Sequence, residues 1–447
     1  MAVNDSFAPR AKPGTNSKIG FAMRALCHRN YRLFFFGQSL SLTGTWMTQV
    51  ATSWLVYRLT NSAFLLGLVG FSGQIPALLL SPFFGVWVDR LNSLRLLKLT
   101  QTLSMLESFA LAVLAFTHTI NIWNIIGLIA FQGAVNALDL PGRQRFLVKM
   151  VEDRGDLANA IALNSLTLNA TRIVGPSIAG VVIALSGEKW CFLIDGFSYL
   201  AVIASLFMMR VGSPPIARKD TSVFHELKRG WDYVVGFSPV RSVLILVAGV
   251  GLVGMPYGVL MPVFAGSVVH GDAHTLGFLT ATSGLGALAS AMVLAMRKSV
   301  IGLGRWVAVC AFLFGAGLIG FGLSHWLWLS LPLLLVTGFC TMQQTAASNI
   351  IIQTIVDEDK RGRVMSFYNM VFIGMAPFGC LMVGGLANSI GAPRTVMIGG
   401  ALCMICAGWF DRAQRNWPPN PARPGGLEIL PKVGTGIKTA SILTRLE

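Results

Sequence analysis

Residues 306–356 read WVAVCAFLFGAGLIGFGLSHWLWLSLPLLLVTGFCTMQQTAASNIIIQTIV, and none of these 51 residues is Asp, Glu, Lys or Arg. One crossing of a lipid bilayer takes about 20 apolar residues, so this stretch is long enough for two crossings, divided near Leu323–Trp326. Similar stretches occur elsewhere: 25 uncharged residues separate Arg32 from Arg58, and 30 separate Arg58 from Asp89. The pattern predicts a chain that crosses a membrane many times.

The composition of the whole chain supports that prediction. Of its 447 residues 54% are hydrophobic and only 12% are charged, whereas globular proteins carry about 25% charged residues. A disordered chain, a coiled coil and an ordinary soluble enzyme are therefore excluded. The remaining class is a multi-pass membrane protein.

The uncharged stretches predict an all-α membrane protein with twelve transmembrane helices. The predicted helices are 33–57, 63–88, 94–117, 121–141, 158–187, 190–210, 242–268, 274–296, 304–324, 326–352, 364–390 and 393–411.

The basic residues predict how these helices are oriented. The net charge is +16, but 31 of the 35 Lys and Arg residues lie in the two termini and in alternate loops, and only Arg58, Lys189 and Arg394 lie in the other loops. Because cytoplasmic loops are enriched in Lys and Arg, both termini are expected in the cytoplasm. The same distribution explains the basic charge without nucleic acid as a partner.

The long connection 211–241 divides the predicted helices into two sets of six. The sets resemble each other: Val151-Glu-Asp precedes Asn164 by 13 residues, as Val356-Asp-Glu precedes Asn369. Internal repeats of this kind are common in transporters, so two pseudo-symmetric six-helix bundles are expected. The predicted organisation is a cytoplasmic tail 1–30, a bundle 31–210, a linker 211–241 with a surface amphipathic helix over 224–235, a second bundle 242–411 and a disordered tail 412–447.

The loop between predicted helices 2 and 3 reads GVWVDRLNSLR, from Gly85 to Arg95. It resembles the signature loop of the major facilitator superfamily, G-x-x-x-D-R-x-G-R-K, in which Gly85, Asp89 and Arg90 match and Asn92 replaces the second glycine. A carboxylate is favoured at a helix N-terminus, so Asp89 is expected there, held by Arg90 or Arg95. The resemblance implies that this loop latches the two halves together on the cytoplasmic side.

Predicted helix 5 contains RIVGPSIAG, from Arg172 to Gly180. It resembles the Gly-Pro motif of the superfamily's exporters. Gly175 and Gly180 permit close helix packing, and Pro176 removes a backbone hydrogen bond. The bend at Pro176 either takes part in the transport motion or is a packing kink alone.

Five further segments are similar to the bacterial subfamily that contains the enterobactin (siderophore) exporter. The similarity extends over about residues 28–400 and includes Asn30-Tyr-Arg-Leu-Phe, Ser39 to Tyr57, Asp139-x-Pro-x-Arg-Gln144, 157–164 and 197–202. The resemblance implies a secondary active transporter, a proton-coupled antiporter that exports a siderophore or drug-like compound by alternating access. The alternatives are an importer or a lipid translocator of the same fold and, from a different class, a non-transporting membrane enzyme or receptor. The resemblance also implies a location in the bacterial inner (plasma) membrane. A monomer is expected, with protons, lipid and a small organic substrate as partners.

Four ionisable residues stand out among those inside the predicted helices, where a charge is costly and is therefore a functional candidate. Glu107, Asp139, Arg172 and Asp195 are the candidates for coupling transport to protons. Arg172 lies at mid-helix and either binds an anionic substrate group or pairs with an acid on a neighbouring helix. Asp139 precedes Arg143 and Arg145, so it either makes a gate contact with them or carries a proton.

Polar, aromatic and methionine side chains on predicted helices 1, 4, 7 and 10 are the candidates for lining a central substrate cavity. A packing role for each amide is the alternative. The candidates are Gln38, Trp46, Gln49, Gln132, Asn136, Met255, Tyr257, Gln343, Gln344 and Asn349.

Other motifs do not indicate enzymatic chemistry or a cofactor. The seven cysteines lie in or beside apolar segments, and His270 and His274 with Asp272 fall in a loop too small for a metal site. The sequence contains no P-loop, G-x-S-x-G or H-E-x-x-H motif. We therefore predict no metal, no cofactor and no enzymatic activity.

Overall fold

The computed structural model describes residues 24–151, 154–209, 232–297 and 302–417, and within these ranges every regular element is a helix. Eleven of its helical segments are long and apolar enough to cross a membrane, and the more polar α2 is the twelfth long one. The first half contains η1 (Arg24–Cys27), α2 (Arg29–Thr60), α3 (Ala63–Arg90), α4 (Ser93–Phe116), α5 (Ile122–Met150), η2 (Arg154–Asp156), α6 (Leu157–Ser186) and α7 (Glu188–Met208).

The second half begins with a segment that is not a regular α-helix. It comprises α9 (Ser238–Gly249), η3 (Val250–Gly254), η4 (Met255–Leu260), α10 (Met261–Val263) and η5 (Phe264–Val268). Regular helices follow: α11 (Ala273–Met296), α12 (Leu303–Leu323), α13 (Leu327–Ile355), α14 (Glu358–Ile390) and α15 (Ala392–Arg415).

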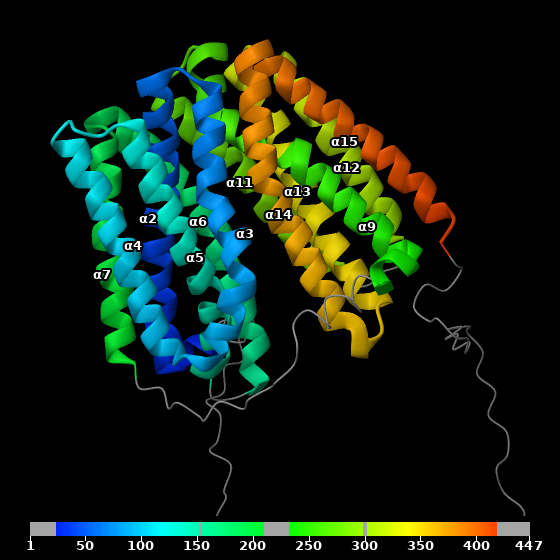
Figure 1. The fold of residues 1–447 in the computed structure, drawn as a ribbon, viewed down its shortest axis with the longest axis horizontal. Helices are drawn as coiled ribbons and strands as arrows, with labels where there is room; N and C mark the ends of the chain where they lie inside the picture. The colour runs from blue at the N-terminus through cyan, green and yellow to red at the C-terminus, as the bar shows by residue number, and fades with distance from the viewer. Residues whose placement is uncertain (1–23, 152–153, 210–231, 298–301, 418–447) are drawn as a thin grey trace, which may run out of the picture.

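The two halves are separate bundles that lie side by side (Figure 1). In the first bundle α7 packs on α2 and α4, and α5 packs on α3 and α4; in the second, α12 packs on α13 and α15. The bundles meet mainly along two helix pairs, α6 with α11 and α3 with α14. The α3–α4 and α13–α14 connections, which are flanked by basic residues, lie at the lower end of the view in Figure 1, where the two bundles diverge.

Glycines allow the bundles to approach at the upper end. A Cβ atom on Gly384 would lie 2.8 Å from the Ala63 carbonyl oxygen and 2.8 Å from Cα of Gly67, and one on Gly277 would lie 2.8 Å from the Pro176 carbonyl oxygen. The contacts continue to mid-helix, where a Cβ atom on Gly284 would lie 3.0 Å from the carbonyl oxygen of Arg172. Any larger side chain would push these backbones apart.

The structure contradicts the predicted regularity of one helix and the predicted end of another. The predicted continuous helix 242–268 is broken into α-, π- and 3-10-helical pieces, because Pro256 and Pro262 have no backbone N–H to donate. The fourth helix was predicted to end at Pro141, but α5 runs on to Met150 with Pro141 inside it. The residues around Pro141 are held by side-chain contacts described below, which offset the lost hydrogen bond.

The connecting segments are only partly described. η1 falls within the predicted N-terminal tail, yet Ala25 is buried and its N–H donates to Oδ1 of Asn159 over 2.9 Å. Of the predicted amphipathic helix 224–235, residues 224–231 lie outside the described ranges, and 232–236 are helical. The predicted C-terminal tail begins as the last turn of α15, and residues 418–447 lie outside the described ranges.

We predict that Gly384→Ala destabilises the protein by about 1–3 kcal/mol, because its new methyl group would overlap the backbone of α3. The matched control is Gly385→Ala, where an added Cβ has no atom within 4 Å and the expected change is within about 0.5 kcal/mol. Thermal unfolding of the purified full-length protein measures both. Equal midpoints for the two variants would contradict the close contact.

Candidate functional site

Arg172 lies in the middle of α6, where the two bundles meet. Its guanidinium carbon is 5.7 Å from the centroid of the Trp46 ring on α2, and its own carbonyl oxygen faces Gly284 of α11. Trp46 can approach because Gly175 has no side chain: a Cβ atom there would lie 2.4 Å from Cβ of Trp46. Among the described residues no carboxylate forms an ion pair with Arg172. The ion pair with a neighbouring helix that the sequence left open is thus absent from the described contacts.

A pair of buried carboxyl groups lies between α4 and α7. Ser108 donates to Oδ2 of Asp195 over 2.9 Å and contacts Oε2 of Glu107 at 3.4 Å. Both acids are at least 96% buried, and Oε1 of Glu107 has no hydrogen-bond partner. Within the described ranges neither acid pairs with a basic side chain. Asp195 is buried because α7 packs closely on Gly44 of α2.

Asp139 is surrounded by donors at the lower part of α5. Thr100 and Gln101 donate to its Oδ1 over 2.7 and 2.8 Å, and Arg143 donates to its Oδ2. The carboxylate is buried and fully paired. This geometry favours the gate or structural contact over the transfer of a proton.

The predicted latch loop is only partly described. The surroundings of Gly85 and the side chains of Asp89 and Arg90 lie outside the described part of the chain, although the backbone of α3 continues to Arg90. The backbone of Asp89 lies in the last turn of α3. Asn92 is the N-cap of α4, and its side chain accepts from the N–H groups of Leu94 and Arg95. At the position where the motif has glycine, the amide oxygen of Asn92 thus satisfies N–H groups that would otherwise be free at the start of α4.

The predicted cavity residues of the first bundle differ in exposure. Gln49 and Asn136 are exposed, Gln132 and Trp46 are half-buried, and Gln38 is buried. Gln132 donates to Asn136 over 3.4 Å and to Oγ of Ser104 over 3.1 Å. These side chains therefore connect an exposed face of α5 with the bundle interior.

The predicted cavity residues of the second bundle are more buried than those of the first. Gln343 is fully buried, accepts from Trp306 and donates to the Ser290 carbonyl, so it belongs to the bundle interior in this conformation. Tyr257 is hydrogen-bonded to Ser283 over 2.9 Å. The other three are a buried Gln344 and half-buried Met255 and Asn349.

Two polar contacts at the upper end were not predicted. Tyr57, in the last turn of α2, is hydrogen-bonded to Ser267 of the second bundle over 2.5 Å, and its ring packs on Gly266. Arg58 pairs with the buried Glu188 over 3.0 Å. Only the adjacent Tyr57 and Arg58 at a helix end offered a sequence signal for either contact.

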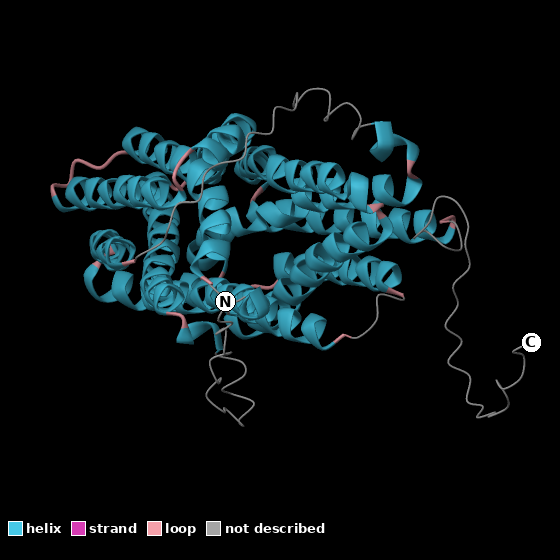
Figure 2. Cartoon of the chain, turned by 90° about the horizontal axis from the view of Figure 1, so that it is seen from below, coloured by secondary structure: helices cyan, strands magenta, loops and turns pink. Residues whose placement is uncertain are grey.

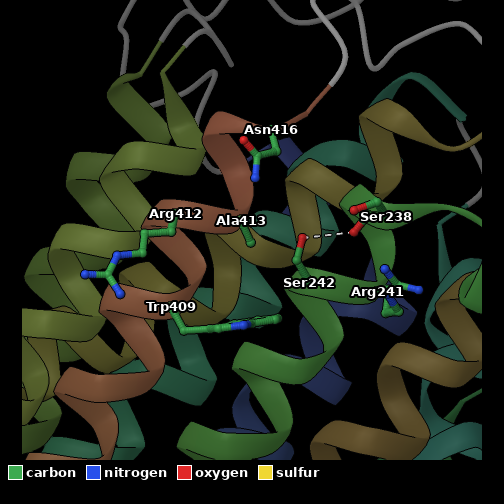
Figure 3. Close-up of a pocket in the computed structure, with 7 residues that line it drawn as sticks. All are labelled: Ser238, Arg241, Ser242, Trp409, Arg412, Ala413 and Asn416. Atoms are coloured by element: carbon green, nitrogen blue, oxygen red, sulfur yellow. Dashed lines mark hydrogen bonds between the residues drawn. The ribbon is translucent and has the colours of Figure 1, made fainter.

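A separate pocket lies at the lower end of the second bundle, between α9 and α15 (Figure 3). Its volume is about 290 Å³, and Ser238, Arg241, Ser242, Trp409, Arg412, Ala413 and Asn416 line it. None of these residues was predicted to line the cavity, and in Figure 3 the side chains of Arg241 and Arg412 extend away from each other. In the described part of the chain, no three His, Cys, Asp or Glu residues are grouped for a metal ion.

A family model described as transmembrane secretion effector (MFS_3) matches residues 21–415. The chain belongs to this family. Its members have the major facilitator fold, so the resemblance drawn from the sequence and the predicted fold class are both confirmed. The chain is a multi-pass membrane transporter.

Two relatives cover most of the chain. The staphyloferrin A transporter of Staphylococcus aureus is 28% identical over 382 residues, which is 85% of this chain and 95% of the relative. The multidrug efflux pump Tap of Mycolicibacterium fortuitum is 26% identical over 385 residues, 82% of this chain and 91% of the pump.

Solved structures share the fold at low identity. A bacterial homologue of the human lysosomal transporter Spinster, inward-facing and occupied, gives a TM-score of 0.68 at 14% identity and covers 88% of this chain and 99% of that one. A bacterial homologue of the iron transporter ferroportin, inward-facing, gives 0.67 at 15% identity and covers 86% and 98%.

We predict that Asp139→Asn destabilises the protein by about 3–5 kcal/mol, because the half-buried Arg143 would lose its charge partner inside the bundle. The control is Asp411→Asn, which breaks the exposed pair with Arg415 and is expected to cost less than about 1 kcal/mol. Thermal unfolding of the full-length variants measures the difference. An Asp139→Asn protein of normal stability that no longer transports would instead indicate a proton-carrying role.

Proposed function

We propose that the protein exports small organic anions, such as a siderophore, across the bacterial inner membrane by antiport with protons. The observation that carries the proposal is Arg172, a half-buried guanidinium at mid-membrane depth that contacts Trp46 and forms no ion pair among the described residues. A charge at this depth costs about 2.5–3.5 kcal/mol on insertion scales. Binding of an anionic substrate group would offset that cost.

The surroundings of Arg172 suit an aromatic or otherwise flat substrate. Trp46 offers a ring face beside the guanidinium, and a planar guanidinium binds carboxylates through two parallel hydrogen bonds. The relatives include a siderophore transporter and a multidrug efflux pump, and we extend the export of organic molecules to this chain on that basis. An importer and a lipid translocator remain alternatives, which the direction of transport in vesicles distinguishes.

The arrangement of the bundles supports alternating access. Their described contacts lie between the upper end and mid-helix. The bundles diverge at the lower end, where the α3–α4 and α13–α14 loops lie (Figure 1). With those loops and both termini in the cytoplasm, the substrate site would open inward in this conformation. In this proposal residues 31–210 and 242–411 move as two rigid bodies that rotate about Arg172. The contact between them is shaped by Gly175, Pro176 and Gly180. The loop from Gly85 to Arg95 closes the inner end.

The carboxyl pair Glu107 and Asp195 is the proposed site of proton coupling. Two buried carboxylates repel each other, and a single bound proton relieves that repulsion. One charge crossing a potential of 100 mV is worth about 2.3 kcal/mol, enough for roughly a fortyfold gradient per proton. Asp195 contacts Gly44 of α2, the helix that also carries Trp46. Protonation at the pair is therefore one helix away from the proposed substrate site.

We predict that energised inside-out vesicles accumulate fluorescein, an aromatic anion, and exclude ethidium, an aromatic cation. Arg172→Gln should weaken fluorescein binding about ten- to a hundredfold, because a charged hydrogen bond is worth about 1.5–3 kcal/mol, and Arg172→Lys should be intermediate. Arg394→Gln, at an exposed position in the first turn of α15, serves as the control and should transport normally. Normal uptake by Arg172→Gln would overturn the site.

We further predict that a protonophore abolishes fluorescein accumulation in the same vesicles. Glu107→Gln and Asp195→Asn should allow equilibration down a gradient but no concentration against one, because the proton site is lost. Glu358→Gln, at the exposed start of α14, should behave as wild type. Accumulation that persists without a proton gradient would refute proton coupling.

A further inference from the structure

One face of α4 carries polar side chains along most of its length inside the first bundle. Thr100, Gln101, Ser104, Glu107 and Ser108 recur at intervals of one helical turn, and each is at least 96% buried. Polar groups in a bilayer-spanning bundle are costly unless they are paired or functional. Packing alone does not require five of them on one face.

The partners of these side chains form a connected series. Gln101 contacts Asp139 at the lower end, Gln132 of α5 donates to Ser104, and Ser108 bridges Glu107 to Asp195. Ser104 and Glu107 are three residues apart and are therefore neighbours on the helix surface. The series joins α5, α4 and α7 across the interior of the bundle.

Three buried oxygen atoms in this series have no hydrogen-bond partner: Oε1 of Gln101, Oε1 of Gln132 and Oε1 of Glu107. All three are acceptors, so only a donor can satisfy them. A water molecule or a hydrated proton is such a donor, and buried water commonly bridges polar groups of this kind.

The series has one exposed end. Asn136 is exposed on α5 and accepts from Gln132, which is half-buried and donates also to the buried Ser104. Exposure therefore falls from Asn136 through Gln132 to the buried Ser104 and Glu107. Asp139, by contrast, is fully paired with Arg143, Thr100 and Gln101 and offers no free position.

We propose that protons reach the Glu107–Asp195 pair from the exposed face of α5, across the interior of the first bundle. They enter at Asn136 and Gln132 and pass the Ser104 hydroxyl. This inference rests on the proposed coupling role of that pair. The amides hold and orient water, and the hydroxyl of Ser104 accepts a proton on one side as it donates one on the other, so charge and atoms balance at each transfer. The route is separate from the substrate contacts of Arg172.

The test is infrared spectroscopy of the full-length protein in lipid bilayers. The carbonyl band of protonated carboxyl groups shifts when H₂O is replaced by D₂O, and the rate of that shift reports how fast protons reach the pair. Gln132→Leu should slow the exchange at least about tenfold, the equivalent of about 1.4 kcal/mol in the barrier, and leave the size of the band unchanged. Ser104→Ala, a smaller change, gives a second measurement if Gln132→Leu does not fold.

The controls separate this route from the coupling site itself. Gln144→Leu is the same substitution at an exposed position of α5 and should exchange at the wild-type rate. Glu107→Gln should reduce the band. Wild-type exchange rates in both Gln132→Leu and Ser104→Ala, with the band present, would overturn the route but leave the coupling pair intact. A wild-type protein without the band would overturn the pair and the route together.

Discussion

Backbone contact between glycines holds the upper ends of the two bundles together, and the other functional features depend on it. Gly384 meets Gly67 and Gly277 meets Gly180 with no room for a Cβ atom. Helix association in lipid has no hydrophobic driving force and relies on such close packing. Because the contact ends at mid-helix, Arg172 lies at its lower limit, at the junction of α2, α6 and α11.

Buried charge in the first bundle is divided between two kinds of site. Asp139 has a cation and two neutral donors and forms a structural contact beside Pro141. Glu107 and Asp195 have only hydroxyl donors in the described ranges, and one oxygen of Glu107 has none. A buried carboxyl group is thus structural at Asp139 and suited to proton exchange at Glu107 and Asp195, because the hydrogen-bond donors around them differ.

Sequence predicted the helices well because the bilayer imposes a strong length and charge pattern. The prediction of a regular helix failed around Pro256 and Pro262, where missing backbone N–H groups override that pattern. The capping role of Asn92 was not predicted, because it depends on where α4 begins. The polar face of α4 was missed although its helical spacing was visible in the sequence. The Tyr57–Ser267 contact joins residues 210 positions apart, so only the folded arrangement of the bundles reveals it.

In the proposed transport cycle the two bundles separate at one end and come into contact at the other. Electron spin resonance distances measure this directly, with one label pair at the exposed Ser186 and Ser389 and another at the exposed Gln144 and Gly362, after replacement of the exposed Cys27. We predict that a proton gradient with fluorescein lengthens the upper distance and shortens the lower one. Distances that stay fixed, or that change in the same direction, would contradict the account.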